Sequence, residues 1–156
     1  MKHSGGSVMV WGCMSWSGVG NMEFIDGIMT KTVYLDILRR NLQESVRKLE
    51  LGRRFVFQED NDPKHTALVI KDFIKENKIK RLDWPSQSPD MNPIEHLWDS
   101  IGREIKKNPP KNKNDLKKGF LEAWQNIRPE ITQNLVNSMN RRMLSVIAAK
   151  GGPTKY

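Results

Sequence analysis

Two carboxylates occupy positions where they could bind a divalent metal ion. Asp60 directly follows an apolar, strand-like stretch at 54–59, and Glu95 falls in the first turn of a helix predicted to begin near residue 92. Carboxylate oxygens are the ligands that hard cations such as Mg²⁺ prefer. Asp60 also ends a strand predicted to be parallel, at the sheet edge where open α/β folds bind ligands. The pattern predicts a metal site with Asp60 and Glu95 as ligands.

Each carboxylate also has a purely structural interpretation. Asp60 opens the segment Asp-Asn-Asp-Pro, in which an aspartate commonly bonds to its own backbone in a turn. Asp62 is the weaker candidate ligand, because it precedes Pro63 and belongs to that turn. Glu95 stands three positions after Asn92, which is the spacing of a helix capping box. Local sequence leaves both interpretations open.

Basic side chains near these carboxylates are candidates for contacts with phosphate groups. Lys64 and His65 follow the Asp60 turn, where a role in starting a helix is the alternative. The run KKNPPKNKN at 106–114 contributes Lys106, Lys107, Lys111 and Lys113. Clustered lysines favour salt-dependent binding of nucleic acid, although such a run is equally typical of a solvated linker.

The elements that position the two carboxylates form a predicted βαβ unit. A strand at 54–59 leads to an amphipathic helix at 65–76 and a second strand at 79–84. A crossover of this length requires the two strands to be parallel. A Pro-rich loop follows, and Asn92 with Pro93 then starts the helix that carries Glu95, because Asn is a good N-cap and Pro suits the first helical position.

The remaining chain predicts a hairpin, a long helix and further helices. Strands at 8–15 and 22–26 flank a turn at 17–21, and a helix at 31–50 is capped by Thr30 or Thr32. Two C-terminal helices carry apolar residues at helical spacing: Leu116, Phe120, Leu121 and Trp124 in one, and Ile131, Leu135, Met139, Met143 and Val146 in the other. This order of elements predicts a mixed α/β domain.

Composition narrows the class of protein. The 156 residues suit one folded domain, and a net charge of +8 favours a polyanionic partner, nucleic acid first. The single cysteine, Cys13, excludes a disulfide within the chain. No apolar run approaches the roughly 20 residues of a membrane span, and no secretory signal is evident, so we expect an intracellular protein.

Three separated stretches identify a family. GGSVMVWGCMS, LGRRFVFQEDNDPKHT and LDWPSQSPDMNPIEHLW resemble the catalytic domain of Tc/mariner superfamily DNA transposases, from about residue 2 to about residue 125. The 34 residues between Asp60 and Glu95 match the family's interval between its second Asp and its Glu. The resemblance implies a ribonuclease H-like fold in which these residues are the second and third members of an Asp-Asp-Glu triad.

The resemblance also implies a reaction and its partners. Such enzymes use two Mg²⁺ or Mn²⁺ ions to cleave DNA at transposon ends and to join the ends to target DNA. We therefore expect DNA as the partner, a second copy of the chain in a homodimer, and location in the nucleus, with no membrane and no small-molecule substrate.

The sequence departs from the family pattern at its start. The family's first catalytic Asp lies on the first strand of the fold, whereas the first aspartate here is Asp26, in the hairpin. We expect an N-terminally truncated ribonuclease H-like domain at 1–107, with a basic linker and helical extension of the same domain at 108–156, and weak or no activity. The alternative is a non-catalytic module, kept as a relic, that binds nucleic acid or protein.

In the family, that first strand lies between the hairpin and the βαβ unit, so its loss leaves two open strand edges. The chain could pair 8–15 with 54–59, recruit a strand from another chain, or be only marginally stable.

Overall fold

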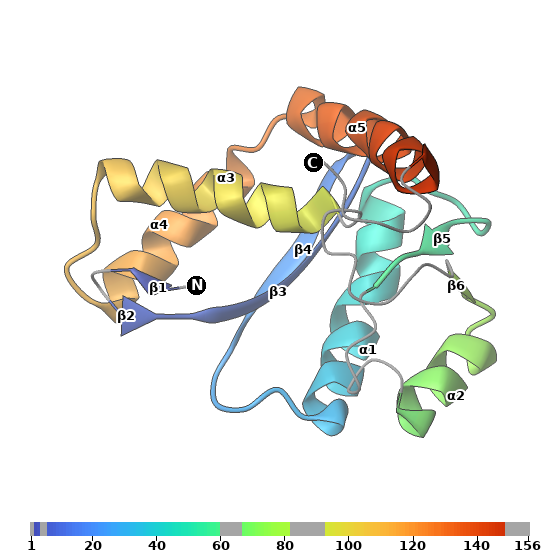
Figure 1. Cartoon of the computed structure of the whole chain (residues 1–156). Helices are drawn as coiled ribbons and strands as arrows, with labels where there is room; N and C mark the ends of the chain where they lie inside the picture. Colours follow the sequence, from blue (N-terminus) through green and yellow to red (C-terminus); the bar gives the residue numbers. More distant parts are fainter. Residues whose placement is uncertain (1, 4–5, 60–66, 82–92, 149–156) are drawn as a thin grey trace.

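The computed structural model describes residues 2–3, 6–59, 67–81 and 93–148, and their side chains within 8–139 (Figure 1). The elements, in order, are β1 (Lys2–His3), β2 (Gly6–Ser7), β3 (Met9–Ser15), β4 (Gly18–Ile25), α1 (Lys31–Lys48), β5 (Val56–Phe57), α2 (Leu68–Glu76), β6 (Lys80–Arg81), α3 (Pro93–Lys107), α4 (Lys113–Gln125) and α5 (Pro129–Ala148). In the described part of the chain, no helix is long and apolar enough to cross a lipid bilayer.

The long hairpin β3–β4 confirms the first predicted pair of strands. β3 and β4 are antiparallel, with Met9 opposite Ile25 and Ser15 opposite Gly18. The turn predicted at 17–21 was wrong, because only Trp16 and Ser17 connect the strands. Gly18 has φ +142°, a conformation that side chains disfavour, so glycine permits this tight reversal. The glycines that suggested a long turn instead belong to β4.

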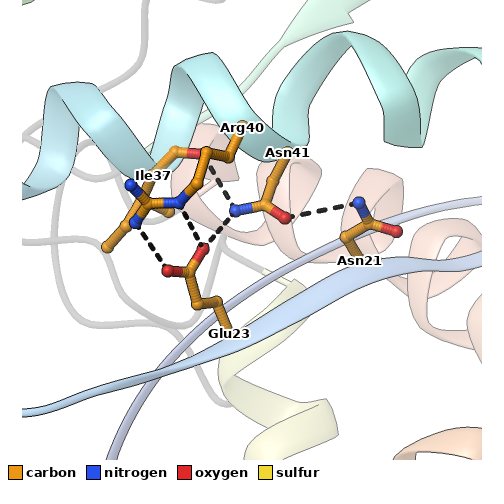
Figure 2. A network of polar contacts seen from close by, with 5 residues as sticks. All are labelled: Asn21, Glu23, Ile37, Arg40 and Asn41. Carbon is orange, nitrogen blue, oxygen red and sulfur yellow. Dashed lines mark hydrogen bonds and ion pairs between the residues drawn. The ribbon is translucent and has the colours of Figure 1, made fainter.

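Helix α1 packs against β4 and begins at the expected cap. The Thr30 side chain accepts a hydrogen bond from the backbone N–H of Val33 at 3.2 Å, which decides between the two predicted caps. Figure 2 shows a polar network between the two elements: the Glu23 carboxylate of β4 accepts hydrogen bonds from Arg40 and Asn41 of α1. The hydrogen bond from Arg40 is the main cause that lowers the pKa of Glu23.

The parallel strands β5 and β6 confirm the predicted βαβ unit. Val56 pairs with Lys80 and Phe57 with Arg81, on either side of α2. β5 is shorter than the predicted 54–59. Of the predicted 79–84, β6 covers Lys80–Arg81, and residues 82–84 lie outside the described part. Ile70, Phe73 and Ile74 of α2 are buried as expected, which places α2 beside α1 in one core.

The predicted C-terminal helices are present, and both ends of the basic run at 106–114 belong to helices. Pro93 is the first residue of α3, as predicted. Lys106 and Lys107 form the last turn of α3, where the helix dipole favours cations. The Asn112 side chain then caps α4 by accepting a hydrogen bond from the N–H of Asp115 at 2.8 Å. The expected linker at 106–114 therefore shrinks to residues 108–112.

Two apolar cores lie on opposite faces of the hairpin. The first joins the hairpin to α1 and α2, and its buried residues include Trp11, Tyr34, Leu38, Leu42, Ile70 and Phe73. The second joins the hairpin to α3 and α4 through Val8, Leu97, Ile101, Ile105, Leu116, Phe120 and Trp124. The hairpin is thus a shared layer between two helical groups.

The strands do not form one continuous sheet. Within the described residues, β3 pairs only with β4, and β5 pairs only with β6. The pairing of 8–15 with 54–59, one of the three expected consequences of the missing strand, is therefore not formed among the described residues.

Candidate nucleic-acid groove

Glu95 lies in a groove at one end of the hairpin. It is an exposed residue in the first turn of α3, whose buried face of Leu97, Ile101 and Ile105 fixes the helix on the second core. The groove has a volume of about 930 Å³. Its lining comes from the start of β3, the end of β4, and helices α3 and α4. A carboxylate in a helix's first turn is favoured by the helix dipole.

The groove carries more positive than negative charge. Among the described residues, two helices supply basic side chains to the groove: Arg103 and Lys106 from α3, and Lys113 and Lys117 from α4. Its two carboxylates, Glu95 and Asp99, lie on the same face of α3 as the two basic residues, because positions three or four apart are neighbours on a helix. The acidic end and the basic end of α3 therefore share one surface.

Lys117 is held in place by contacts with the end of the hairpin. Its Nζ lies 3.6 Å from a carboxylate oxygen of Asp26 and 5.6 Å from the centre of the Phe24 ring. A lysine over an aromatic ring gains a cation–π attraction. These contacts keep a positive charge beside the groove even without a ligand.

The structure separates the predicted phosphate contacts into two groups. Lys106 and Lys113 line the groove together with Glu95. Lys107 instead forms an exposed ion pair with Glu104 at 3.0 Å, and Lys111 lines a different cavity, of about 560 Å³, beside Pro109 and Pro110. Asp60, Lys64 and His65 lie outside the described residues.

The contact residues predicted from the sequence did not include Arg103 or Lys117. Both carry a detectable signal, since Arg103 lies three residues before Lys106, and Lys117 lies four residues after Lys113, so each pair shares a helix face. That the two faces meet in one groove depends on how α3 packs against α4.

A buried carboxylate stands next to Asp60 in the sequence. Glu59 is 8% exposed and accepts hydrogen bonds from the Tyr34 hydroxyl of α1 and from the Arg81 guanidinium of β6. The network ties α1, β5 and β6 together at the point where the chain reaches Asp60.

The donor chemistry of the described residues fits a hard cation only in part. Within the described ranges, no group of three or more His, Cys, Asp or Glu side chains could hold a metal ion. Glu95 offers carboxylate oxygens, which suit Mg²⁺ or Mn²⁺, from an exposed position in the groove. Asn92, the other half of the expected capping box, lies outside the described residues, so the structural role of Glu95 is untested.

Comparison with protein families gives a match over most of the chain. A family model described as DDE superfamily endonuclease matches residues 1–117. The Tcb2 transposable element transposase of Caenorhabditis briggsae is 46% identical over 156 residues, which are 100% of this chain and 57% of that protein. The chain therefore spans a little over half of the length of this relative.

Solved structures share the fold. The catalytic domain of Mos1 transposase, in a structure with Raltegravir and Mg, has a TM-score of 0.85 at 21% sequence identity, covering 95% of this chain and 77% of that one. The Mos1 paired-end complex with the left transposon end gives the same TM-score and identity over 45% of its chain. These similarities confirm the predicted ribonuclease H-like, mixed α/β fold class.

Proposed function

Because the chain belongs to the DDE superfamily endonucleases and is of the Tc/mariner type, we propose that it binds DNA in the groove between α3 and α4 during DNA transposition. The observation that carries this proposal is the groove itself, in which Glu95 shares one surface with Arg103, Lys106, Lys113 and Lys117. DNA is a polyanion, so a row of fixed cations beside a candidate catalytic carboxylate suits a phosphate backbone positioned for reaction.

We further propose that Asp60 and Glu95 hold divalent metal ions, Mg²⁺ or Mn²⁺. When bound, such ions activate the attacking oxygen and stabilise the leaving oxygen in DNA cleavage and strand transfer. Glu95 supplies a charged ligand from the first turn of α3. The basic residues hold the DNA backbone beside it. The buried Glu59 network anchors the strand that leads to Asp60.

The residues of this chain account for two carboxylates of the three that the resemblance requires. The first 25 residues contain no aspartate, and Asp26 pairs with Lys117 at the end of the hairpin. Two carboxylates balance the charge of a pair of divalent ions poorly. We therefore propose that these 156 residues alone have weak or no cleavage activity.

The proposed partners are transposon-end DNA, target DNA and a second copy of the chain. A relative's complex named for paired transposon ends supports the first and the last of these. The net charge of +8 supports binding to DNA in general. Chromosomal DNA as target would place the protein in the nucleus.

A DNA-binding assay tests whether the groove is the binding site for DNA. In fluorescence anisotropy with a labelled duplex, the double variant Lys106→Ala/Lys113→Ala should weaken binding and make the salt dependence less steep by about 2 in the slope of log K against log salt, since each phosphate contact contributes about 0.9. The matched control is Lys107→Ala/Lys111→Ala, which removes the same charge outside the groove. Equal losses in both double variants would show that the groove has no special role.

Catalysis is tested separately, in a nicking assay on transposon-end DNA with Mg²⁺ or Mn²⁺. We expect binding with little or no nicking by the chain alone. Metal-dependent nicking that disappears in Asp60→Ala would overturn the proposed inactivity. DNA binding without any metal response, in contrast, would favour the alternative of a non-catalytic nucleic-acid-binding relic, for which the same basic groove is sufficient.

A further inference from the structure

A second groove runs between α3 and α4, on the side of both helices away from the basic groove described above. It has a volume of about 560 Å³ and extends from the loop at 108–112 to the start of α5. On an ideal helix, its lining positions on α3 and α4 lie roughly 180° around the axis from those that line the basic groove. The two grooves share no lining residue among those described, so they are separate sites.

The floor of this second groove is apolar. Ile101 and Ile105 of α3 are buried beneath it, and Ala123 and Ile127 come from α4 and the turn after it. Ile131 of α5 also lines the groove and is 38% exposed. Apolar surface in a groove gains free energy when a partner removes it from water. The floor therefore suits the apolar stripe of a partner rather than a wholly polar ligand.

The rim of the second groove is negatively charged, although the chain has a net charge of +8. Glu104 of α3 lies on one side, and Asp115 and Glu122 of α4 lie on the other, with Lys111 as the basic residue of the described lining. Glu104 forms an exposed ion pair with Lys107, whereas Asp115 and Glu122 form none within the described part of the chain. Carboxylates on both sides repel nucleic acid and attract a cationic partner. We call this site the acidic groove.

A glycine in the middle of α4, Gly119, lies on the floor of the acidic groove. Glycine destabilises the interior of a helix relative to alanine. At Gly12 and Gly20 the packing of the chain itself explains the glycine, because an added Cβ would lie 2.7 Å from a neighbouring side chain. At Gly119 an added Cβ would meet no described atom within 4 Å. The glycine instead leaves room for a partner's backbone to come close to α4.

We propose that the acidic groove binds a basic amphipathic α-helix of a partner protein. The helix lays a narrow apolar stripe along the isoleucine floor and passes close over Gly119. Its lysine or arginine side chains reach Glu104 on one side, and Asp115 and Glu122 on the other. An amphipathic helix in an apolar groove is a common mode of recognition. Charges that flank the apolar stripe select the partner, as they do in coiled coils.

The length of the acidic groove specifies the length of the bound helix. The lining on α4 runs from Asp115 to Asn126, a rise of about 16 Å along the helix axis, which is about three turns. Asp115 and Glu122 lie about two turns apart on α4, so two cations about two turns apart on the partner meet both carboxylates. The partner helix therefore needs about three turns, with apolar residues at positions i, i+3 or i+4, and i+7.

The test uses the full chain and a fluorescent synthetic peptide of about 16 residues, since shorter helices are marginal in water. The peptide is rich in alanine, with leucines at helical spacing on one face and lysines on both sides of them. One control peptide has glutamate in place of every lysine, and another has a central proline, which breaks the helix. In fluorescence anisotropy, each control should bind about tenfold or more weakly.

General charge attraction does not contribute to this binding, because the chain and the lysine peptide are both cationic overall. Tighter binding of the lysine peptide than of the glutamate peptide would therefore report a local acidic site. If either control peptide binds as tightly as the lysine peptide, the proposal is wrong.

A variant of the floor locates the peptide in the acidic groove. Gly119→Leu puts a side chain into the open space on the floor and should weaken peptide binding about tenfold or more. Gln125→Leu is the matched control, because Gln125 is exposed on the same helix and does not line the groove. Circular dichroism of each free variant establishes that it is folded. Equal peptide binding by the two folded variants would contradict the proposal.

A variant of the rim tests the charges. Glu104→Gln/Glu122→Gln removes one carboxylate from each side of the groove and should weaken peptide binding about three- to tenfold. Its control is Glu44→Gln/Glu76→Gln, which removes two exposed carboxylates of α1 and α2 outside the groove. Equal losses in the two double variants would show that the rim does not select the partner.

A second copy of the chain is the other occupant that the experiment distinguishes. Sedimentation velocity of the free chain should show no association that depends on the acidic groove. Self-association that both the peptide and Gly119→Leu abolish would make the groove an interface between copies, and would overturn the proposal. The inference does not rest on DNA binding, since Lys106→Ala/Lys113→Ala should leave peptide binding unchanged and Gly119→Leu should leave DNA binding unchanged.

Discussion

The indole Nε1 of Trp124 donates a hydrogen bond of 3.1 Å to the backbone carbonyl oxygen of Gly20, which joins α4 to β4 across 104 residues of sequence. Trp124 is 4% exposed, and its ring stacks on Trp98 of α3 with 5.3 Å between ring centres. This contact supports the proposal that the C-terminal helices and the hairpin belong to one domain.

Trp124→Phe should lower the free energy of unfolding by about 1–3 kcal/mol, because it removes the hydrogen bond and leaves the Gly20 carbonyl unsatisfied. Denaturant unfolding followed by circular dichroism measures the change. Trp16→Phe is the control, since Trp16 is 52% exposed and should change stability by no more than about 0.5 kcal/mol. If α4 and α5 unfold in a separate transition, the single-domain proposal fails.

Two glycines should respond to alanine in opposite directions. A Cβ atom added at Gly12 would lie 2.7 Å from the Trp98 ring and 2.8 Å from the Trp124 ring, so Gly12→Ala should destabilise the chain by about 1–3 kcal/mol. A Cβ at Gly119, within α4, meets no atom within 4 Å, so Gly119→Ala should stabilise by about 0.5–1 kcal/mol. Thermal unfolding of both variants checks the pair, and destabilisation by both would contradict the packing described.

The Glu23–Arg40 ion pair makes part of the stability depend on pH. The pKa of the Glu23 carboxyl is lowered in the folded chain, chiefly by the hydrogen bond from Arg40. The unfolded state therefore binds the proton more readily than the folded state. The stabilisation is therefore present above the unfolded pKa of about 4.3 and is lost as pH falls through the folded pKa.

A double-mutant cycle of Glu23→Gln and Arg40→Gln measures this coupling across pH. The coupling free energy should be favourable at neutral pH and disappear in acid. A coupling that persists after Glu23 is protonated would show that charge is not its source. High salt should weaken the coupling at neutral pH, because the Arg40 side chain is 55% exposed.

Glu95→Gln should increase DNA affinity in metal-free buffer, roughly two- to fivefold, because it removes a negative charge from the groove next to the bound backbone. Glu122→Gln removes an equal charge from an exposed site that lines a different cavity, and serves as the control. Anisotropy titrations with EDTA present measure both. Unchanged affinity in Glu95→Gln would place the bound DNA away from Glu95.

The local elements were largely predictable, because their signals lie within a few residues of one another. Pro93 at the first position of α3 and the parallel pairing of β5 with β6 follow from short-range rules. The way in which helices pack, in contrast, does not follow from such short-range signals. Lys106 and Lys107 are neighbours in sequence, yet only Lys106 lines the groove with Glu95, since the orientation of α3 on the second core decides which face is inward.

The turn of the hairpin shows a second limit of prediction from the sequence. Glycine and asparagine at 18–21 resemble a loop, but β4 begins at Gly18, which pairs with Ser15 of β3. Farther along β4, the backbone N–H of Asn21 donates a hydrogen bond to the Ser45 hydroxyl of α1 at 2.9 Å. A tertiary contact thus overrides a local preference. The separation of the hairpin from the β5–β6 pair, in contrast, was expected from the resemblance, and it is what the described residues show.

The exposed edge of β5 has a consequence for the protein in the cell. Val56, on that strand, is 48% exposed, and an apolar strand edge is a template for uncontrolled pairing with other chains. Chaperones and proteases act on such surfaces. The abundance of the chain in the cell would then depend on how much of this apolar surface stays accessible after synthesis.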